Sequence, residues 1–95
     1  MREVTRPVEV LVVTAPGCHF CDDALRLLDE LGEVTPLTVR TVPISSDEGR
    51  AFIVRYRVPF PPILIVDGVL FGYGRISHRK LESHLAQRAN TDLVV

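Results

Sequence analysis

This 95-residue sequence contains no tryptophan, only two cysteines and no surplus of either charge. Its formal net charge of −1 gives no electrostatic argument for nucleic acid or an anionic membrane as a partner. No apolar run approaches the roughly 18 residues of a membrane-spanning helix, and the first six residues are polar, unlike an apolar leader. We therefore expect a single domain over residues 1–95, cytoplasmic and monomeric, with no nucleic acid or membrane partner.

Both cysteines lie in one stretch, Pro16-Gly17-Cys18-His19-Phe20-Cys21. The segment 8–14 before it is nearly continuous in aliphatic and β-branched residues, which predicts a strand buried on both faces. From Cys18 to Leu31 the apolar residues recur at helical spacing, and Gly32 is the expected stop. Two thiols at C-x-x-C spacing on a strand-to-helix turn can close a small disulfide ring and reopen it, which indicates a redox-active dithiol.

The rest of the chain alternates strand and helix patterns before it ends in a hairpin and a last helix. In chain order we expect a strand at 36–44, a helix at 49–57, strands at 63–66 and 69–73, and a helix from Ser77 to about Ala89. Pro43 cannot donate to a sheet, so it should end a strand near the sheet edge. Asp67-Gly68 predicts the hairpin turn, Leu81 and Leu85 lie on the core face of the last helix, and residues 90–95 form a tail.

This order, β-α-β-α-β-β-α, predicts an α/β fold with a four-stranded mixed sheet flanked by helices. Helices between the early strands imply parallel crossovers, and the hairpin implies an antiparallel pair.

The sequence resembles the thioredoxin/glutaredoxin superfamily in three places. Cys18-His19-Phe20-Cys21 ends the first core strand, Pro62 precedes the strand at 63–66 where the superfamily places its cis-proline, and Gly74-Arg75-Ile76-Ser77 leads into the last helix. The string from Pro16 to Asp22 is most similar to a glutaredoxin-like family with a P-G-C-H-x-C-D motif. The resemblance implies a thioredoxin-like fold and dithiol–disulfide exchange with a protein or small-molecule disulfide.

The resemblance also implies roles for the site residues. Cys18 would be the exposed nucleophile and Cys21 the resolving thiol, while Pro61 and Pro62 would contact the substrate. His19 and Phe20 are further candidates for substrate contact because they lie between the two cysteines. In the superfamily, the residue before the cis-proline lends its backbone N–H and C=O to the disulfide partner, but Pro61 has no N–H. No cofactor or metal is expected within the chain, and a reductase or a low-molecular-weight thiol would supply the electrons.

Some alternatives remain open at this point. The fold could serve as a binding module in which the cysteines take no part in redox turnover. Cys18 and Cys21 could instead bind zinc with His78 or His84, although no second C-x-x-C completes the usual four-ligand set. The cis-proline could be Pro61, which would leave Phe60 with its N–H available. Finally, Val12 stands where thioredoxin has a buried acid, so the usual proton acceptor for Cys21 is absent.

Overall fold

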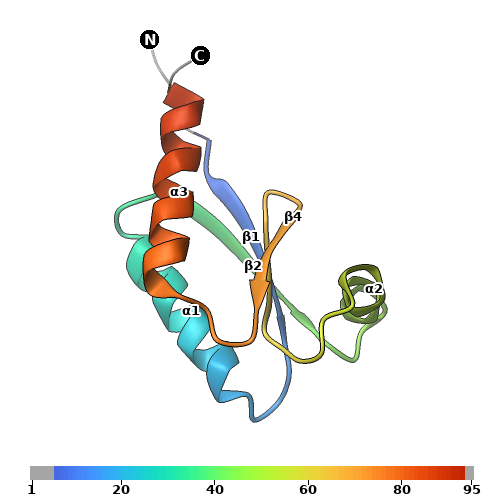
Figure 1. The fold of residues 1–95 in the computed structure, drawn as a ribbon. Helices are drawn as coiled ribbons and strands as arrows, with labels where there is room; N and C mark the ends of the chain where they lie inside the picture. The colour runs from blue at the N-terminus through green and yellow to red at the C-terminus, as the bar shows by residue number, and fades with distance from the viewer. Residues whose placement is uncertain (1–5, 94–95) are drawn as a thin grey trace.

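The structure, a computed structural model, describes the backbone of residues 6–93 and the side chains of residues 6–88. Four strands and three helices follow one another along this part of the chain (Figure 1). They are β1 Val8–Thr14, α1 His19–Leu31, β2 Leu37–Pro43, α2 Asp47–Tyr56, β3 Ile63–Val66, β4 Val69–Tyr73 and α3 His78–Leu93. No helix among the described residues is both long and apolar enough to cross a membrane.

The strands form one four-stranded mixed sheet, as the sequence predicted, and their order in the sheet is β2-β1-β3-β4. β2 runs parallel to β1, whereas β3 runs antiparallel to both β1 and β4. The expectation of parallel crossovers therefore holds for β1-α1-β2 and is wrong for β2-α2-β3. The reason is that Val13 pairs with both Val42, near the end of β2, and Ile63, at the start of β3. The connection through α2 thus returns the chain to the sheet end that it left.

Helices cover both faces of the sheet, with α1 and α3 on one side and α2 on the other (Figure 1). β1 contributes side chains to the hydrophobic cores on both faces of the sheet, because alternate side chains of a strand point to opposite faces. Val8, Val10 and Val12 belong to the core cluster that includes residues of α1 and α3. Leu11 and Val13 belong to the cluster packed against α2. This double burial explains why β1 has an almost unbroken hydrophobic sequence.

Leu81 and Leu85 of α3 are fully buried in the first of these clusters, as predicted. α3 begins after Ser77, whose hydroxyl accepts the Lys80 N–H at 3.2 Å, and it continues to Leu93. The predicted tail is therefore wrong for residues 90–93, whose backbone is helical, while residues 94–95 lie outside the described part. The longer helix is consistent with the sequence, because no proline or glycine occurs between residues 78 and 93.

The other element boundaries lie within two residues of the predictions. β2 ends at Pro43, and α1 ends at Leu31 with Gly32 as its C-cap in a right-handed conformation (φ −65°). α2 begins two residues earlier than expected because the Ser46 hydroxyl accepts the Gly49 N–H at 3.0 Å and caps the helix. In the β3–β4 turn, Asp67 and Gly68 both have positive φ, the conformation that an Asp-Gly hairpin adopts.

Candidate redox site

The motif cysteines lie at the carboxyl end of β1, where the chain turns into α1. Gly17 adopts a φ of +67°, which a glycine tolerates without strain, and the chain enters the helix immediately afterwards. A disulfide joins Cys18 to Cys21, with their Cα atoms 5.2 Å apart. Cys18 is half-buried, whereas Cys21 is only 2% exposed and lies one turn inside the helix. The pair is therefore asymmetric: a partner can reach the first sulfur more readily than the second.

The Cys18 side chain caps α1. Its backbone is extended (φ −96°, ψ 104°), and its Sγ accepts a hydrogen bond from the Cys21 N–H at 3.1 Å. The first N–H groups of a helix lack partners within the helix and carry the positive end of its dipole. Sulfur at this position is therefore in an environment that favours negative charge. Among the nearby acids, Asp23 pairs with Arg26 at 3.2 Å and Asp22 is exposed.

His19 and Phe20 occupy the first turn of α1 between the two cysteines, and both are exposed, Phe20 at 43%. Within the described residues, neither side chain makes a hydrogen bond, an ion pair or a ring contact. These two side chains are thus available to an incoming molecule. Val12, in contrast, is fully buried, and the described residues contain no buried polar or charged side chain that could serve as an internal proton acceptor near Cys21.

The Pro61–Pro62 peptide bond is cis, so the cis-proline is Pro62, as the resemblance implied, and the alternative of Pro61 is wrong. Pro62 is buried and its carbonyl accepts the Gly74 N–H at 2.8 Å. The pairing of Ile63 with Val13 places the residues before β3 next to the residues after β1. The two prolines and the cysteine motif therefore lie at the same end of the sheet.

The sequence analysis missed an aromatic pair at this end. Phe60 and Tyr73 meet edge to face with ring centroids 5.7 Å apart, and the rings stay 49% and 42% exposed. Gly74 permits the arrangement: its φ is +70°, and a Cβ there would lie 2.7 Å from the Phe60 ring. An aromatic residue before Pro-Pro and a glycine directly after an aromatic strand end were the signals that could have revealed it.

The zinc alternative finds no support in the geometry. Within the described part of the chain, no three His, Cys, Asp or Glu side chains are grouped so that they could hold a metal ion. His84 packs against the Phe71 ring with centroids 5.3 Å apart, and the nearest carboxylate oxygen to His78 Nε2 belongs to Glu82, at 3.9 Å. Neither histidine is therefore placed with the cysteine pair.

The chain belongs to the glutaredoxin family, because the model of that family matches residues 10–71. This match includes the cysteine motif, Pro61 and Pro62, most of β1 and all of β2 and β3. A comparison with curated proteins finds no match.

Solved structures agree on the thioredoxin-like fold. A mutant thioredoxin from Halobacterium salinarum is 22% identical, with a TM-score of 0.64 over 86% of this chain and 74% of that one. Glutaredoxin 1 from Francisella tularensis, complexed with cacodylate, is 15% identical, with a TM-score of 0.58 over 87% and 98% of the two chains. A thioredoxin-like protein from Clostridium perfringens is 11% identical, with a TM-score of 0.66 over 85% and 70%. At these identities the likeness concerns the fold.

Proposed function

We propose that this protein is a dithiol–disulfide oxidoreductase in which Cys18 attacks and Cys21 resolves. The observation that carries the proposal is the asymmetric pair at the start of α1. Cys18 is only half-buried and its sulfur accepts a backbone N–H of the helix, whereas Cys21 is buried one turn further on. Membership of the glutaredoxin family supports the same chemistry.

In the reducing direction, the Cys18 thiolate attacks one sulfur of the substrate disulfide and forms a mixed disulfide. The other substrate sulfur leaves as a thiolate and takes a proton. The Cys21 thiol then loses its proton and attacks the Cys18 sulfur, which releases the second substrate thiol and leaves the Cys18–Cys21 disulfide seen here. Two electrons from a reductase or a low-molecular-weight thiol restore the dithiol. The same steps in reverse oxidise a partner.

The direct test traps the mixed disulfide. In Cys21→Ser the attacking thiol remains and the resolving thiol is lost, so we expect covalent adducts with disulfide substrates that accumulate and are released by dithiothreitol. Cys18→Ser is the matched control and should form none. Adducts on Cys21 in that control, or the absence of adducts in both variants, would contradict the assigned roles.

A redox titration distinguishes this function from the rival of a thioredoxin-fold binding module. A reversible two-electron couple within the range of redox proteins, about −120 to −270 mV, is expected for the oxidoreductase. A cysteine pair that neither a thiol buffer nor a reductase reduces under these conditions would favour the binding module. We propose that the exchange takes place in the cytoplasm, within a monomer, and contributes to electron transport and redox homeostasis there.

The substrate contact at the proline loop predicts weak glutathione binding and poor deglutathionylation compared with ordinary glutaredoxins. Pro61, half-buried at the same sheet end as the motif, has no N–H and offers a bound partner only its carbonyl. A neutral hydrogen bond contributes about 0.5–1.5 kcal/mol, so the missing donor weakens binding by about two- to twelvefold. His19 and Phe20 complete the proposed contact surface, and Pro62, which is itself buried, shapes the groove beneath it.

Pro61→Val tests this argument because it restores an N–H at a similar side-chain volume. We expect the variant to bind glutathione more tightly than the wild type and to reduce glutathionylated substrates faster. Pro59→Val is a control in the same loop, and it should change neither property. Unchanged or weaker glutathione binding in Pro61→Val would count against the missing-donor argument without affecting the assignment of the cysteines.

A further inference from the structure

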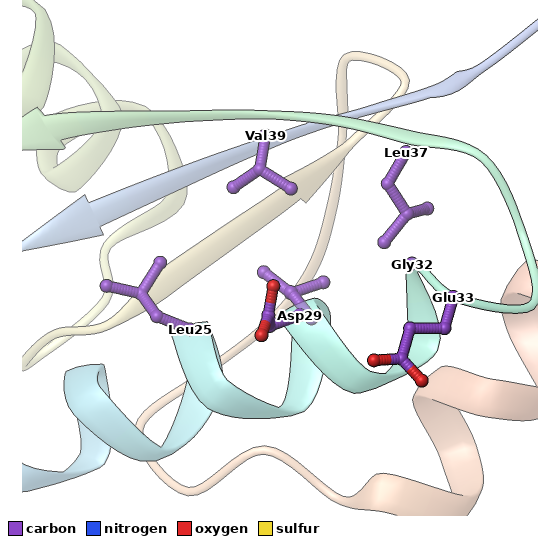
Figure 2. A pocket seen from close by; sticks show the side chains of 7 residues that line it. Leu25, Asp29, Gly32, Glu33, Leu37 and Val39 are labelled. Carbon is purple, nitrogen blue, oxygen red and sulfur yellow. The ribbon is translucent and has the colours of Figure 1, made fainter.

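The open edge of β2 and the groove beside it form a second surface, away from the disulfide. β2 is an end strand of the sheet and pairs only with β1. The groove lies between β2 and α1, has a volume of about 410 Å³, and is lined by Leu25, Leu28, Asp29, Gly32, Glu33, Leu37 and Val39. Figure 2 shows the side chain of Val39 pointing from β2 toward Leu25 and Asp29 on α1, and that of Leu37 pointing toward Gly32 at the end of the helix.

The backbone of β2 offers free hydrogen-bonding groups along this edge. At the two ends of the β1–β2 ladder, Val8 N–H donates to the Pro36 carbonyl at 3.0 Å and Ile44 N–H donates to the Thr14 carbonyl at 2.7 Å. Because a parallel ladder uses alternate residues, the even-numbered residues of β2 face β1. The N–H and C=O groups of Leu37, Val39 and Thr41 therefore point away from the sheet.

This open edge has defined limits. Pro36 precedes it, and Pro43, which has no N–H, already accepts hydrogen bonds at its carbonyl from Ser46. Between these prolines the register is regular over the whole strand. The opposite edge strand, β4, is interrupted by a bulge where it pairs with Leu64 and Ile65 of β3. Bulges protect edges against strand addition, so β2 is the edge of this sheet that is suited to it.

The side chains that line the groove indicate which kind of partner would fit it. Its floor is apolar, and Val39 remains 41% exposed above it. Asp29 and Glu33 line the groove with carboxylates that are exposed and have no ion-pair partner among the side chains of residues 6–88. The guanidinium of Arg40 does not neutralise them, since it makes two hydrogen bonds to Glu48, at 3.0 and 2.8 Å. An apolar side chain flanked by lysine or arginine matches these features.

A second copy of this chain does not match them. Antiparallel pairing of two β2 strands would continue the sheet across a two-fold axis and place both α1 helices on the same face. The carboxylates of Asp29 and Glu33 would then face their own counterparts across the junction. Like charges brought together at an interface repel each other, so the edge favours a basic partner over itself.

We propose that the β2 edge binds an extended segment of a partner protein by strand addition, with an apolar side chain in the groove and basic side chains at Asp29 and Glu33. The segment forms main-chain hydrogen bonds with Leu37, Val39 and Thr41, while alternate side chains supply the specificity. This binding goes beyond the disulfide exchange proposed above, and neither proposal depends on the other.

The test uses the oxidised full-length protein and the peptide acetyl-Lys-Thr-Val-Thr-Lys-amide, whose lysines and valine share one face when it is extended. At low ionic strength we expect the amide NMR signals of Leu37, Val39 and Thr41 to shift and to exchange more slowly with solvent. The charge-reversed double variant Asp29→Lys/Glu33→Lys should bind on the order of tenfold more weakly. Glu30→Lys, on the same helix but outside the groove, should bind within about twofold of the wild type.

A backbone variant separates strand addition from simple charge attraction. Thr41→Pro removes an N–H that points away from β1, a position where an edge strand tolerates proline, and should weaken binding by about two- to twelvefold. Thr41→Val keeps the N–H and should bind like the wild type.

Three results would overturn the proposal. They are no response of the three amides at millimolar peptide, an equal response to acetyl-Glu-Thr-Val-Thr-Glu-amide, and shifts of the same amides on raising the protein concentration without peptide. The last result would identify the edge as a self-association surface instead.

Discussion

The backbone N–H of Cys21 should lower the pKa of the Cys18 thiol in the reduced protein, and a proline can remove this donor. The hydrogen bond from this N–H to the Cys18 sulfur is 3.1 Å long in the disulfide form. A hydrogen bond to a charged group contributes about 1.5–3 kcal/mol, and a helix N-terminus about 0.3–1 kcal/mol. Taking about 2 kcal/mol in total in favour of the thiolate, we expect the pKa of the Cys18 thiol to lie below the ordinary cysteine value.

The experiment compares Cys21→Ala with Cys21→Pro. Both variants lose the resolving thiol, and only the proline loses the N–H; proline is tolerated in the first turn of a helix because N–H groups there lack helical partners. Iodoacetamide alkylation of Cys18 as a function of pH gives the thiol pKa. We expect the proline variant to titrate about one pH unit higher than the alanine variant and to alkylate more slowly at pH 7.

Circular dichroism and thermal unfolding must first show that the proline variant keeps its fold. Cys18→Ala, which retains only the buried Cys21, should alkylate more slowly than either variant at every pH. Equal Cys18 pKa values in the alanine and proline variants would refute the role of the N–H. A Cys18 pKa at or above about 8.5 in Cys21→Ala would refute the wider argument that the helix start favours the thiolate.

Three further predictions follow from single contacts. Because the buried Val12 replaces an acid and the start of α1 favours the reduced thiolate, the couple should be less reducing than that of thioredoxin; a potential at or below about −270 mV would contradict this. Gly74→Ala places a Cβ 2.7 Å from the Phe60 ring at positive φ and should lower the free energy of unfolding by about 1–3 kcal/mol; Phe60→Ala should recover part of the loss, and additive effects of the two changes would exclude the clash. The two-point hydrogen bond from Arg40, aided by its charge, lowers the pKa of Glu48 from its ordinary value. The stability that this interaction contributes is therefore present above the ordinary glutamate pKa and is lost as the pH falls through the lower folded-state pKa, so the difference in urea unfolding between wild type and Glu48→Gln should disappear in acid.

Local signals in the sequence predicted most of the fold. The buried strand at 8–14, the Asp-Gly turn and the helix stop at Gly32 each depend on a few neighbouring residues, and the structure confirms them. The direction of β3 could not be predicted in this way. It depends on where α2 delivers the chain, which the packing of Ile44, Phe52 and Tyr56 against the second core cluster determines.

The residues of the candidate site likewise fall into those that local sequence predicts and those that depend on contacts between distant parts of the chain. The C-x-x-C spacing predicted Cys18 and Cys21 as site residues, and the resemblance predicted Pro62 from its position before the strand at 63–66. The Phe60–Tyr73 pair joins residues 13 apart that meet only when β3 and β4 pair, so the local signals mark the two residues and not the contact between them. The groove at β2 is harder still to predict from the sequence, since it exists only because α1 and β2 leave space between Leu25 and Val39.

The two proposed surfaces place a geometric condition on any partner that uses both. Near the disulfide, the described residues offer a substrate a cysteine sulfur, aromatic edges and a proline carbonyl, which together recognise little beyond an accessible disulfide. The β2 edge can add sequence preference, but Asp29 is eleven residues beyond Cys18 on α1, roughly 16 Å along the helix. A partner segment held at Asp29 therefore needs about five extended residues to bring its own cysteine to Cys18. Such a tether makes the attack effectively intramolecular, and the gain is lost when the connecting segment is too short to span the distance.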